Sequence, residues 1–132
     1  MSIEDRRKVM LIDDNEIDLF INQKVLEFNN FASEVTSVMA AQIAIDKLRS
    51  LTSESVPDVI FLDLNMPVVD GFKFLYEFSL LDDCVKSRIK IVVLTSSDNF
   101  KDKEKVAANP DVLTYISKPL TDDKLAEVQL LL

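Results

Sequence analysis

The chain has 132 residues, of which 48% are hydrophobic and 29% are charged, and its formal net charge is −8. This length and composition are typical of one globular domain. The negative charge and the lack of a long basic run argue against direct binding of nucleic acid. No apolar stretch approaches the roughly 18 residues of a membrane span, and no apolar signal core follows the charged N-terminus. We therefore expect a cytoplasmic protein without membrane insertion.

The counts of three residue types exclude whole classes of site. The chain has no histidine, which excludes a histidine general base, a histidine-ligated zinc and a phosphohistidine on this chain. Gly71 is the only glycine, so neither a glycine-rich phosphate loop nor a dinucleotide-binding fingerprint can form. Cys84 is the only cysteine, which excludes an internal disulfide. We interpret it as a reduced packing or surface thiol rather than a nucleophile.

The first half of the chain alternates short apolar runs with segments of helical periodicity. We predict strands over residues 8–12, 34–38 and 59–62. The runs Val-Met-Leu-Ile at 9–12 and Val-Ile-Phe-Leu at 59–62 are continuous and apolar, as in strands buried on both faces. A helix follows the first strand, with Asp14 or Asn15 as its N-cap. Its periodicity is carried by Ile17, Phe20, Ile21, Val25 and Phe28. A second helix is marked by Ala41, Ala44, Ile45 and Leu48, and residues 50–57 read as a loop.

The second half continues the same alternation. Residues 65–71 form a turn-rich loop, and Phe72, Leu75 and Phe78 mark the next helix. Strands are predicted over 89–94 and 113–116, separated by a helix over 100–108 that Asn109 and Pro110 stop. Thr121 can cap the last helix. The predicted inner stripe of that helix is Leu125, Val128 and Leu132.

The resulting order is a strand followed by a helix, repeated five times. Such alternation predicts a single α/β domain with a parallel sheet and helices on both faces, a doubly wound (βα)5 architecture. We expect residues 1–7 to be an N-terminal arm and residues 8–132 to be the domain.

Polar residues stand at the ends of four of the predicted strands. Asp13 and Asp14 close the first strand, Asp63 the third, Thr95 the fourth, and Lys118 follows the fifth. Taken singly, each of these residues has an ordinary explanation: an aspartate often caps a helix, Thr95 favours a strand end, and Lys118 is a solvated charge. In an open α/β sheet, however, functional groups gather at the carboxyl ends of the strands. Three carboxylates, a hydroxyl and an ammonium at one spot can hold a hard cation such as Mg²⁺ and carry a phosphoryl group.

Four motifs resemble the receiver domain of two-component response regulators, the module shared with the chemotaxis receiver. They are Leu-Ile-Asp-Asp-Asn at 11–15, Phe-Leu-Asp-Leu-Asn-Met-Pro-Val-Val-Asp-Gly at 61–71, Val-Leu-Thr-Ser-Ser at 93–97 and Tyr-Ile-Ser-Lys-Pro-Leu at 115–120. The resemblance covers nearly the whole chain. It implies a flavodoxin-like fold with strand order 2-1-3-4-5.

The resemblance also implies a role for each site residue. Asp63 is the phosphoacceptor, and Thr95 and Lys118 hold the phosphoryl oxygens. Mg²⁺ is the expected cofactor, and its expected ligands are Asp13, Asp14, Asp63 and the backbone carbonyl of Asn65. Thr95 and Tyr115 form the switch. A cis peptide bond is implied between Lys118 and Pro119.

The implied function is a phosphorylation-controlled signalling switch in a two-component phosphorelay, with at most self-catalysed phosphoryl transfer and autodephosphorylation rather than true enzymatic activity. A sensor histidine kinase or a histidine phosphotransfer protein would supply the phosphoryl group. On phosphorylation, the face formed by the fourth helix, fifth strand and fifth helix would change which downstream protein it binds. The chain would be a monomer or a weak homodimer through that face. Because the sequence ends in the fifth predicted helix, we expect a stand-alone receiver or a piece of a longer protein.

Three alternatives stay open at this point. A haloacid-dehalogenase-like phosphohydrolase also forms an aspartyl phosphate with Mg²⁺, but it needs a second aspartate two residues after the nucleophile, where this chain has Asn65. A phosphorylation-independent interaction module would not need the full set of site residues. A flavodoxin-like flavin carrier would need a phosphate-binding loop, which this sequence lacks.

Overall fold

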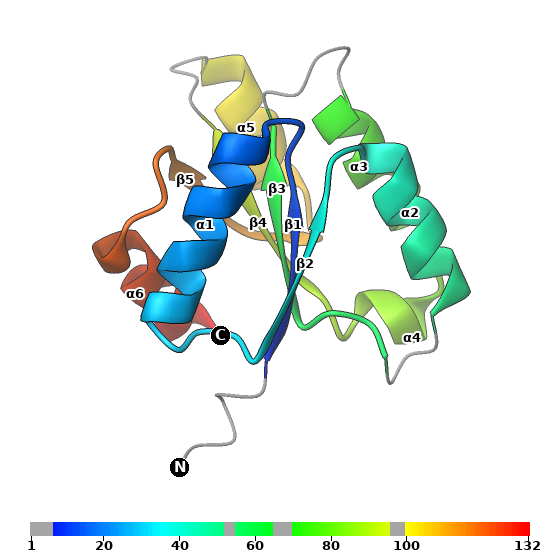
Figure 1. Cartoon of the computed structure of the whole chain (residues 1–132). Coiled ribbons are helices and arrows are strands. Elements are labelled where there is room, and N and C mark those ends of the chain that lie inside the picture. Colours follow the sequence, from blue (N-terminus) through cyan, green and yellow to red (C-terminus); the bar gives the residue numbers. More distant parts are fainter. Residues whose placement is uncertain (1–6, 52–54, 65–69, 96–99) are drawn as a thin grey trace.

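The chain folds around a five-stranded sheet that has helices on both faces (Figure 1). The computed structural model describes residues 7–51, 55–64, 70–95 and 100–132. The strands are β1 (Lys8–Ile12), β2 (Glu34–Val38), β3 (Val59–Asp63), β4 (Lys90–Thr95) and β5 (Val112–Ser117). The helices are α1 (Glu16–Phe28), α2 (Ala41–Ser50), α3 (Asp70–Ser79), α4 (Asp83–Lys86), α5 (Phe100–Ala108) and α6 (Asp122–Leu131).

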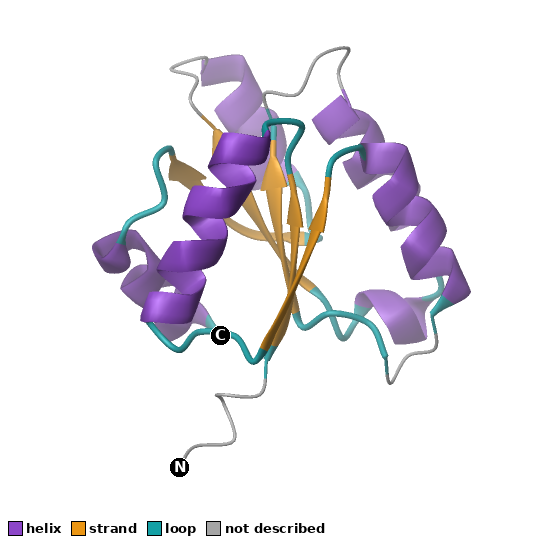
Figure 2. Ribbon diagram, in the orientation of Figure 1, coloured by secondary structure: helices purple, strands orange, loops and turns teal. Residues whose placement is uncertain are grey.

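The strands are all parallel and lie in the order β2-β1-β3-β4-β5, which confirms the predicted fold class and strand order. Their arrowheads point to the same edge of the sheet (Figure 2). The register pairs Ile12 of β1 with Leu62 of β3, and Asp63 of β3 with Leu94 of β4. The residues that follow these strands therefore meet at one edge.

Alternate residues of the central strands pack into two separate hydrophobic layers. Met10, Ile60 and Ile91 belong to the layer beneath α2, α3 and α5. Their neighbours Leu11 and Phe61 belong to the layer beneath α1 and α6. Burial on both faces explains why these strands appear in the sequence as continuous apolar runs.

Helix α1 is present as predicted, but the residues that revealed it do not form its buried face. Leu19, Asn22 and Leu26 face the sheet. Four of the five residues used for the prediction point to solvent: Ile17, Phe20, Ile21 and Phe28, which are 68%, 62%, 47% and 79% exposed. Both sets have helical spacing, so periodicity alone could not choose between them.

The helix caps agree with the predictions. Asn15 is the N-cap of α1, and its Oδ1 accepts hydrogen bonds from the backbone N–H of Ile17 and Asp18. Thr121 caps α6 by accepting from the backbone N–H of Lys124.

Three details differ from the prediction. The four-residue helix α4 adds a sixth helix among the described residues, before β4. Gly71 lies inside α3 and not in the preceding loop, and residues 65–69 of that loop are outside the described residues. Leu125 and Val128 are buried beneath α6 as predicted, but Leu132 is half-exposed at the chain end, where the helix has already finished.

Of the helices described, none has both the length and the apolar character to span a membrane.

Candidate functional site

Asp13, Asp14 and Asp63 meet at the carboxyl edge of the sheet, as the sequence predicts. Each offers a carboxylate oxygen, and these oxygens lie within 4.8 Å of one another. The backbone fixes the cluster: the N–H of Asp13 donates to the carbonyl of Val38, and the N–H of Leu64 donates to the carbonyl of Leu94. Asp13 and Asp63 are buried, whereas Asp14 is exposed. The cluster thus has two carboxylates in its floor and one at its opening.

Lys118 brings a positive charge to this cluster from the end of β5. Its Nζ lies 3.0 Å from Asp63 Oδ1 and 3.9 Å from Asp13 Oδ2. The backbone N–H of Lys118 donates to the carbonyl of Thr95 at 2.9 Å, and the peptide bond to Pro119 is cis, as the resemblance implied. Burial by itself lowers the pKa of Lys118, but the hydrogen bond with Asp63 and the charges of the surrounding carboxylates outweigh it and raise that pKa. Lys118 therefore stays a cation at neutral pH.

The surroundings of Asp13 disfavour its charged form. Burial, together with the charge of Asp63, raises its pKa from 3.8 to about 6, although the hydrogen bond from the Asn15 backbone N–H and the charge of Lys118 act in the opposite direction. Asp13 Oδ1 accepts the Asn15 hydrogen bond at 2.9 Å. Its Oδ2 is buried and has no hydrogen-bond partner among the described residues.

This donor set fits a divalent cation. Carboxylate oxygens are the ligands that Mg²⁺ prefers, and Mg²⁺ usually takes only a few of them from the protein. The unsatisfied Oδ2 of Asp13 and the nearby oxygens of Asp14 and Asp63 offer such a set. A bound cation would also relieve the repulsion among the three carboxylates.

Of the remaining predicted site residues, the structure describes Thr95 and Tyr115 but not Asn65. Thr95 ends β4 and is buried beside Ser117 of β5 in the sheet register. Tyr115 lies on β5 with its side chain 40% exposed. Asn65, predicted as a metal ligand through its carbonyl, lies outside the described residues.

The structure also adds a residue that the sequence analysis missed. Asp18, in the first turn of α1, places its Oδ2 3.6 Å from Lys118 Nζ. The sequence places Asp18 three residues after the Asn15 cap, in the first turn of the helix that follows β1, but it does not show that this side chain reaches Lys118.

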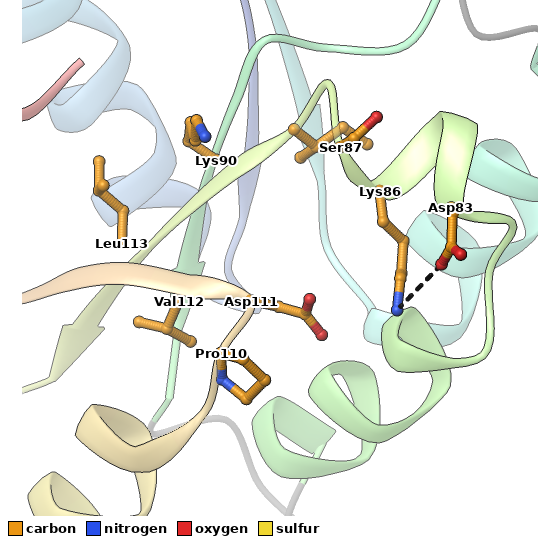
Figure 3. Close-up of a pocket in the computed structure, with 9 residues that line it drawn as sticks. Asp83, Lys86, Ser87, Lys90, Pro110, Asp111, Val112 and Leu113 are labelled. Carbon is orange, nitrogen blue, oxygen red and sulfur yellow. Dashed lines mark ion pairs between the residues drawn. The ribbon is translucent and has the colours of Figure 1, made fainter.

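A different pocket lies at the opposite edge of the sheet, where β4 and β5 begin (Figure 3). Its lining includes Asp83, Lys86, Lys90 and Asp111. Lys86 Nζ lies 3.9 Å from Asp83 Oδ1, so these two charges face each other. The pocket shares no residue with the acidic cluster and is separate from it.

Known proteins resemble this chain in sequence and in structure over most of its length. The family model for the response regulator receiver domain matches residues 9–129. A response regulator receiver protein from Dyadobacter fermentans is 34% identical, with a TM-score of 0.82 over 92% of this chain and 93% of that chain. The phosphorylated cyanobacterial phytochrome response regulator RcpA is 31% identical, with a TM-score of 0.73 over 93% and 88% of the two chains. The Mn²⁺-bound form of response regulator Rcp1, a protein of Synechocystis, is 28% identical, with a TM-score of 0.70 over 93% and 89%.

Some relatives are far longer than this chain. The hybrid signal transduction histidine kinases L and E of Dictyostelium discoideum are both 28% identical to it, over 92% and 88% of its length. The matched regions are only 7% and 6% of those proteins.

Proposed function

Because this chain belongs to the response regulator receiver domain family, we propose that it is a phosphorylation-controlled switch of a two-component phosphorelay, with Asp63 as its phosphoacceptor. The observation that carries the proposal is the contact between Asp63 Oδ1 and Lys118 Nζ at 3.0 Å, inside a cluster of three carboxylates. Such a site offers a nucleophilic oxygen next to a fixed cation. Domain limits of 8–132, an N-terminal arm over 1–7 and a cytoplasmic location belong to the same proposal.

The chemistry requires one bond to form and one to break. A carboxylate oxygen of Asp63 attacks the phosphorus of a phosphohistidine, the phosphorus–nitrogen bond breaks, and the histidine ring keeps the electron pair and takes up a proton. Lys118 neutralises the phosphoryl oxygens, and the Thr95 hydroxyl donates to one of them. Mg²⁺, held by Asp13, Asp14, Asp63 and the carbonyl of Asn65, supplies further charge neutralisation when it is bound. Related receivers named as phosphorylated and as Mn²⁺-bound support this assignment.

We propose that the phosphoryl donor is a sensor histidine kinase or a histidine phosphotransfer protein, the partners that receiver domains generally use. This chain has no histidine, so the phosphohistidine belongs to the donor. We propose that the donor docks on the exposed face of α1 formed by Ile17, Phe20, Ile21 and Phe28, called here the α1 apolar face. The same helix reaches the site, since Asp18 of its first turn contacts Lys118. A partner seated on this face would thus present its phosphohistidine beside Asp63.

We propose that the output surface is the α5-β5-α6 face. This is the face predicted from the sequence as the fourth helix, fifth strand and fifth helix, because the short helix α4 shifts the helix numbers by one. The same face is the proposed contact for a weak homodimer. Phosphorylation adds charge and acceptor oxygens next to Thr95. Thr95 then turns toward the phosphoryl group, and Tyr115, half-exposed before phosphorylation, turns inward. This population shift changes the downstream protein that binds. Beryllofluoride, which mimics the phosphoryl group, should move the NMR resonances of Tyr115 much more than those of Tyr76, the exposed tyrosine on α3.

The direct test is phosphorylation by a small donor. The protein is incubated with acetyl phosphate and Mg²⁺, and its intact mass is compared with that of Asp63→Asn and of a sample containing EDTA. One phosphoryl adduct on the parent, lost in both comparisons, supports the proposal. Rapid turnover of a generic phosphate ester would instead favour a phosphohydrolase. No adduct, with Mg²⁺ binding demonstrated, would favour a phosphorylation-independent module.

A further inference from the structure

A fourth carboxylate borders the proposed phosphoacceptor site. Asp18 Oδ2 lies 3.6 Å from Lys118 Nζ, while Asp63 Oδ1 lies 3.0 Å from the same nitrogen. The side chain of Asp18 is 41% exposed, against 3% for Asp63. The Lys118 ammonium is therefore shared between a buried carboxylate in the floor of the site and an exposed one at its rim.

The position of Asp18 is fixed by the start of α1. Its backbone N–H donates to Asn15 Oδ1 at 3.1 Å, and the N–H of Asn15 donates to Asp13 Oδ1 at 2.9 Å. The N-cap thus connects the backbone of Asp18 to the floor of the same site. A carboxylate on an anchored backbone can restrain the end of a long, flexible lysine side chain.

We propose that Asp18 is a positioning residue, which holds the Lys118 ammonium toward the rim, where the oxygens of the incoming phosphoryl group arrive. The proposal rests on the proposed function of Asp63. If Asp63 were the only partner of Lys118, the ammonium would sit on the nucleophile and lower the electron density of its oxygens. Sharing with Asp18 keeps the cation close to both the nucleophile and the donor.

The charge of Asp18 also affects the phosphorylation rate in the opposite direction, and the experiment must separate this effect from positioning of Lys118. Its negative charge repels an anionic donor, so removing it should by itself speed phosphorylation. Glu16 provides the matched control, because it is the other acidic residue in the first turn of α1 and is not among the carboxylates that pair with Lys118. Glu16→Gln removes the same charge from the same turn without removing the anchor.

The experiment compares the initial phosphorylation rates of the parent, Asp18→Asn, Asp18→Glu and Glu16→Gln by intact mass, with Mg²⁺ present. Two donors are used: acetyl phosphate, mainly a dianion at neutral pH, and phosphoramidate, mainly a monoanion. Loss of the anchor should make Asp18→Asn about 2- to 5-fold slower than Glu16→Gln with both donors, the range expected for a partly exposed ion pair. Asp18→Glu should recover most of the parent rate, because it keeps the charge within reach of Lys118.

An Asp18→Asn rate equal to or above that of Glu16→Gln would overturn the proposal, and so would an Asp18→Glu rate as low as that of Asp18→Asn. Urea unfolding of the four proteins shows whether a rate has fallen through loss of folding. Failure of the parent to accept a phosphoryl group from either donor would count against the proposed function itself. A phosphorylated parent with matching rates for Asp18→Asn and Glu16→Gln would remove only the role of Asp18.

Discussion

Replacing Asp13 with asparagine should stabilise the metal-free protein at neutral pH. The Asp13 carboxylate is 2% exposed and its Oδ2 has no hydrogen-bond partner among the described residues. Burial and the charge of Asp63 raise its pKa from 3.8 to about 6. An amide of the same shape keeps Oδ1 as the acceptor for the Asn15 N–H, and it removes a charge that the fold has taken out of water.

The magnitude follows from the pKa shift. At 1.36 kcal/mol per pKa unit, a shift from 3.8 to about 6 corresponds to at most about 3 kcal/mol. The folded state binds this proton more tightly than the unfolded state does. The contribution of Asp13 to the free energy of unfolding is therefore most favourable below about pH 4 and is lost as the pH rises to about 6.

The assay is urea and thermal unfolding in EDTA, at about pH 4 and at about pH 7. Asp13→Asn should gain about 1–3 kcal/mol over the parent at neutral pH, a rise in Tm of about 4–10 °C, and its advantage should vanish at the lower pH. Asp14→Asn is the control, because it removes an exposed carboxylate of the same cluster and should change stability by less than about 0.5 kcal/mol. The reasoning is refuted if the two variants are equally stable at neutral pH. With excess Mg²⁺ the parent should regain stability that Asp13→Asn does not.

Three further substitutions test other parts of the structure. Lys118→Met removes the cation 3.0 Å from Asp63 and should slow phosphorylation by acetyl phosphate by about 100-fold, measured by intact mass; a rate near that of the parent would contradict the role of Lys118. Gly71→Ala would place a methyl group 3.0 Å from the Leu64 Cα and 3.1 Å from its carbonyl oxygen, so urea unfolding should show a loss of about 1–3 kcal/mol even though alanine favours helices; unchanged stability would be inconsistent with this close packing. Phe20→Ser on the α1 apolar face should leave the free energy of unfolding within about 0.5 kcal/mol of the parent value and should weaken transfer from a histidine-phosphorylated donor protein but not from acetyl phosphate; equal loss with both donors would argue against docking on this face.

The sheet and the site cluster were predictable because both depend on short-range patterns. A strand buried on both faces is a continuous apolar run, and its end is marked by the first polar residue. Parallel pairing in the strand order that the resemblance implies then brings Asp13, Asp63 and Lys118 together. The strands differ from the prediction mainly at their ends: β3 and β4 include Asp63 and Thr95, because the backbone continues its pairing beyond the last apolar side chain.

Other features depend on tertiary contacts that periodicity does not contain. Two apolar stripes run along α1, and only packing against the sheet selects Leu19 and Leu26 for burial. Helix α4 has four residues, which is too few to produce a periodic signal. The pairing of Asp18 with Lys118 joins residues 100 positions apart in the sequence, so the local pattern at either end could not specify it.

The central claim, that Asp63 carries the phosphoryl group, is tested most directly by locating that group chemically. The protein is phosphorylated with acetyl phosphate and Mg²⁺, the acyl phosphate is reduced with borohydride, and the digested peptides are sequenced by mass spectrometry. Reduction converts a phosphorylated aspartate to homoserine, and the account predicts homoserine at position 63 in the treated sample only. Homoserine at position 13 or 14 with an unchanged Asp63 would contradict it.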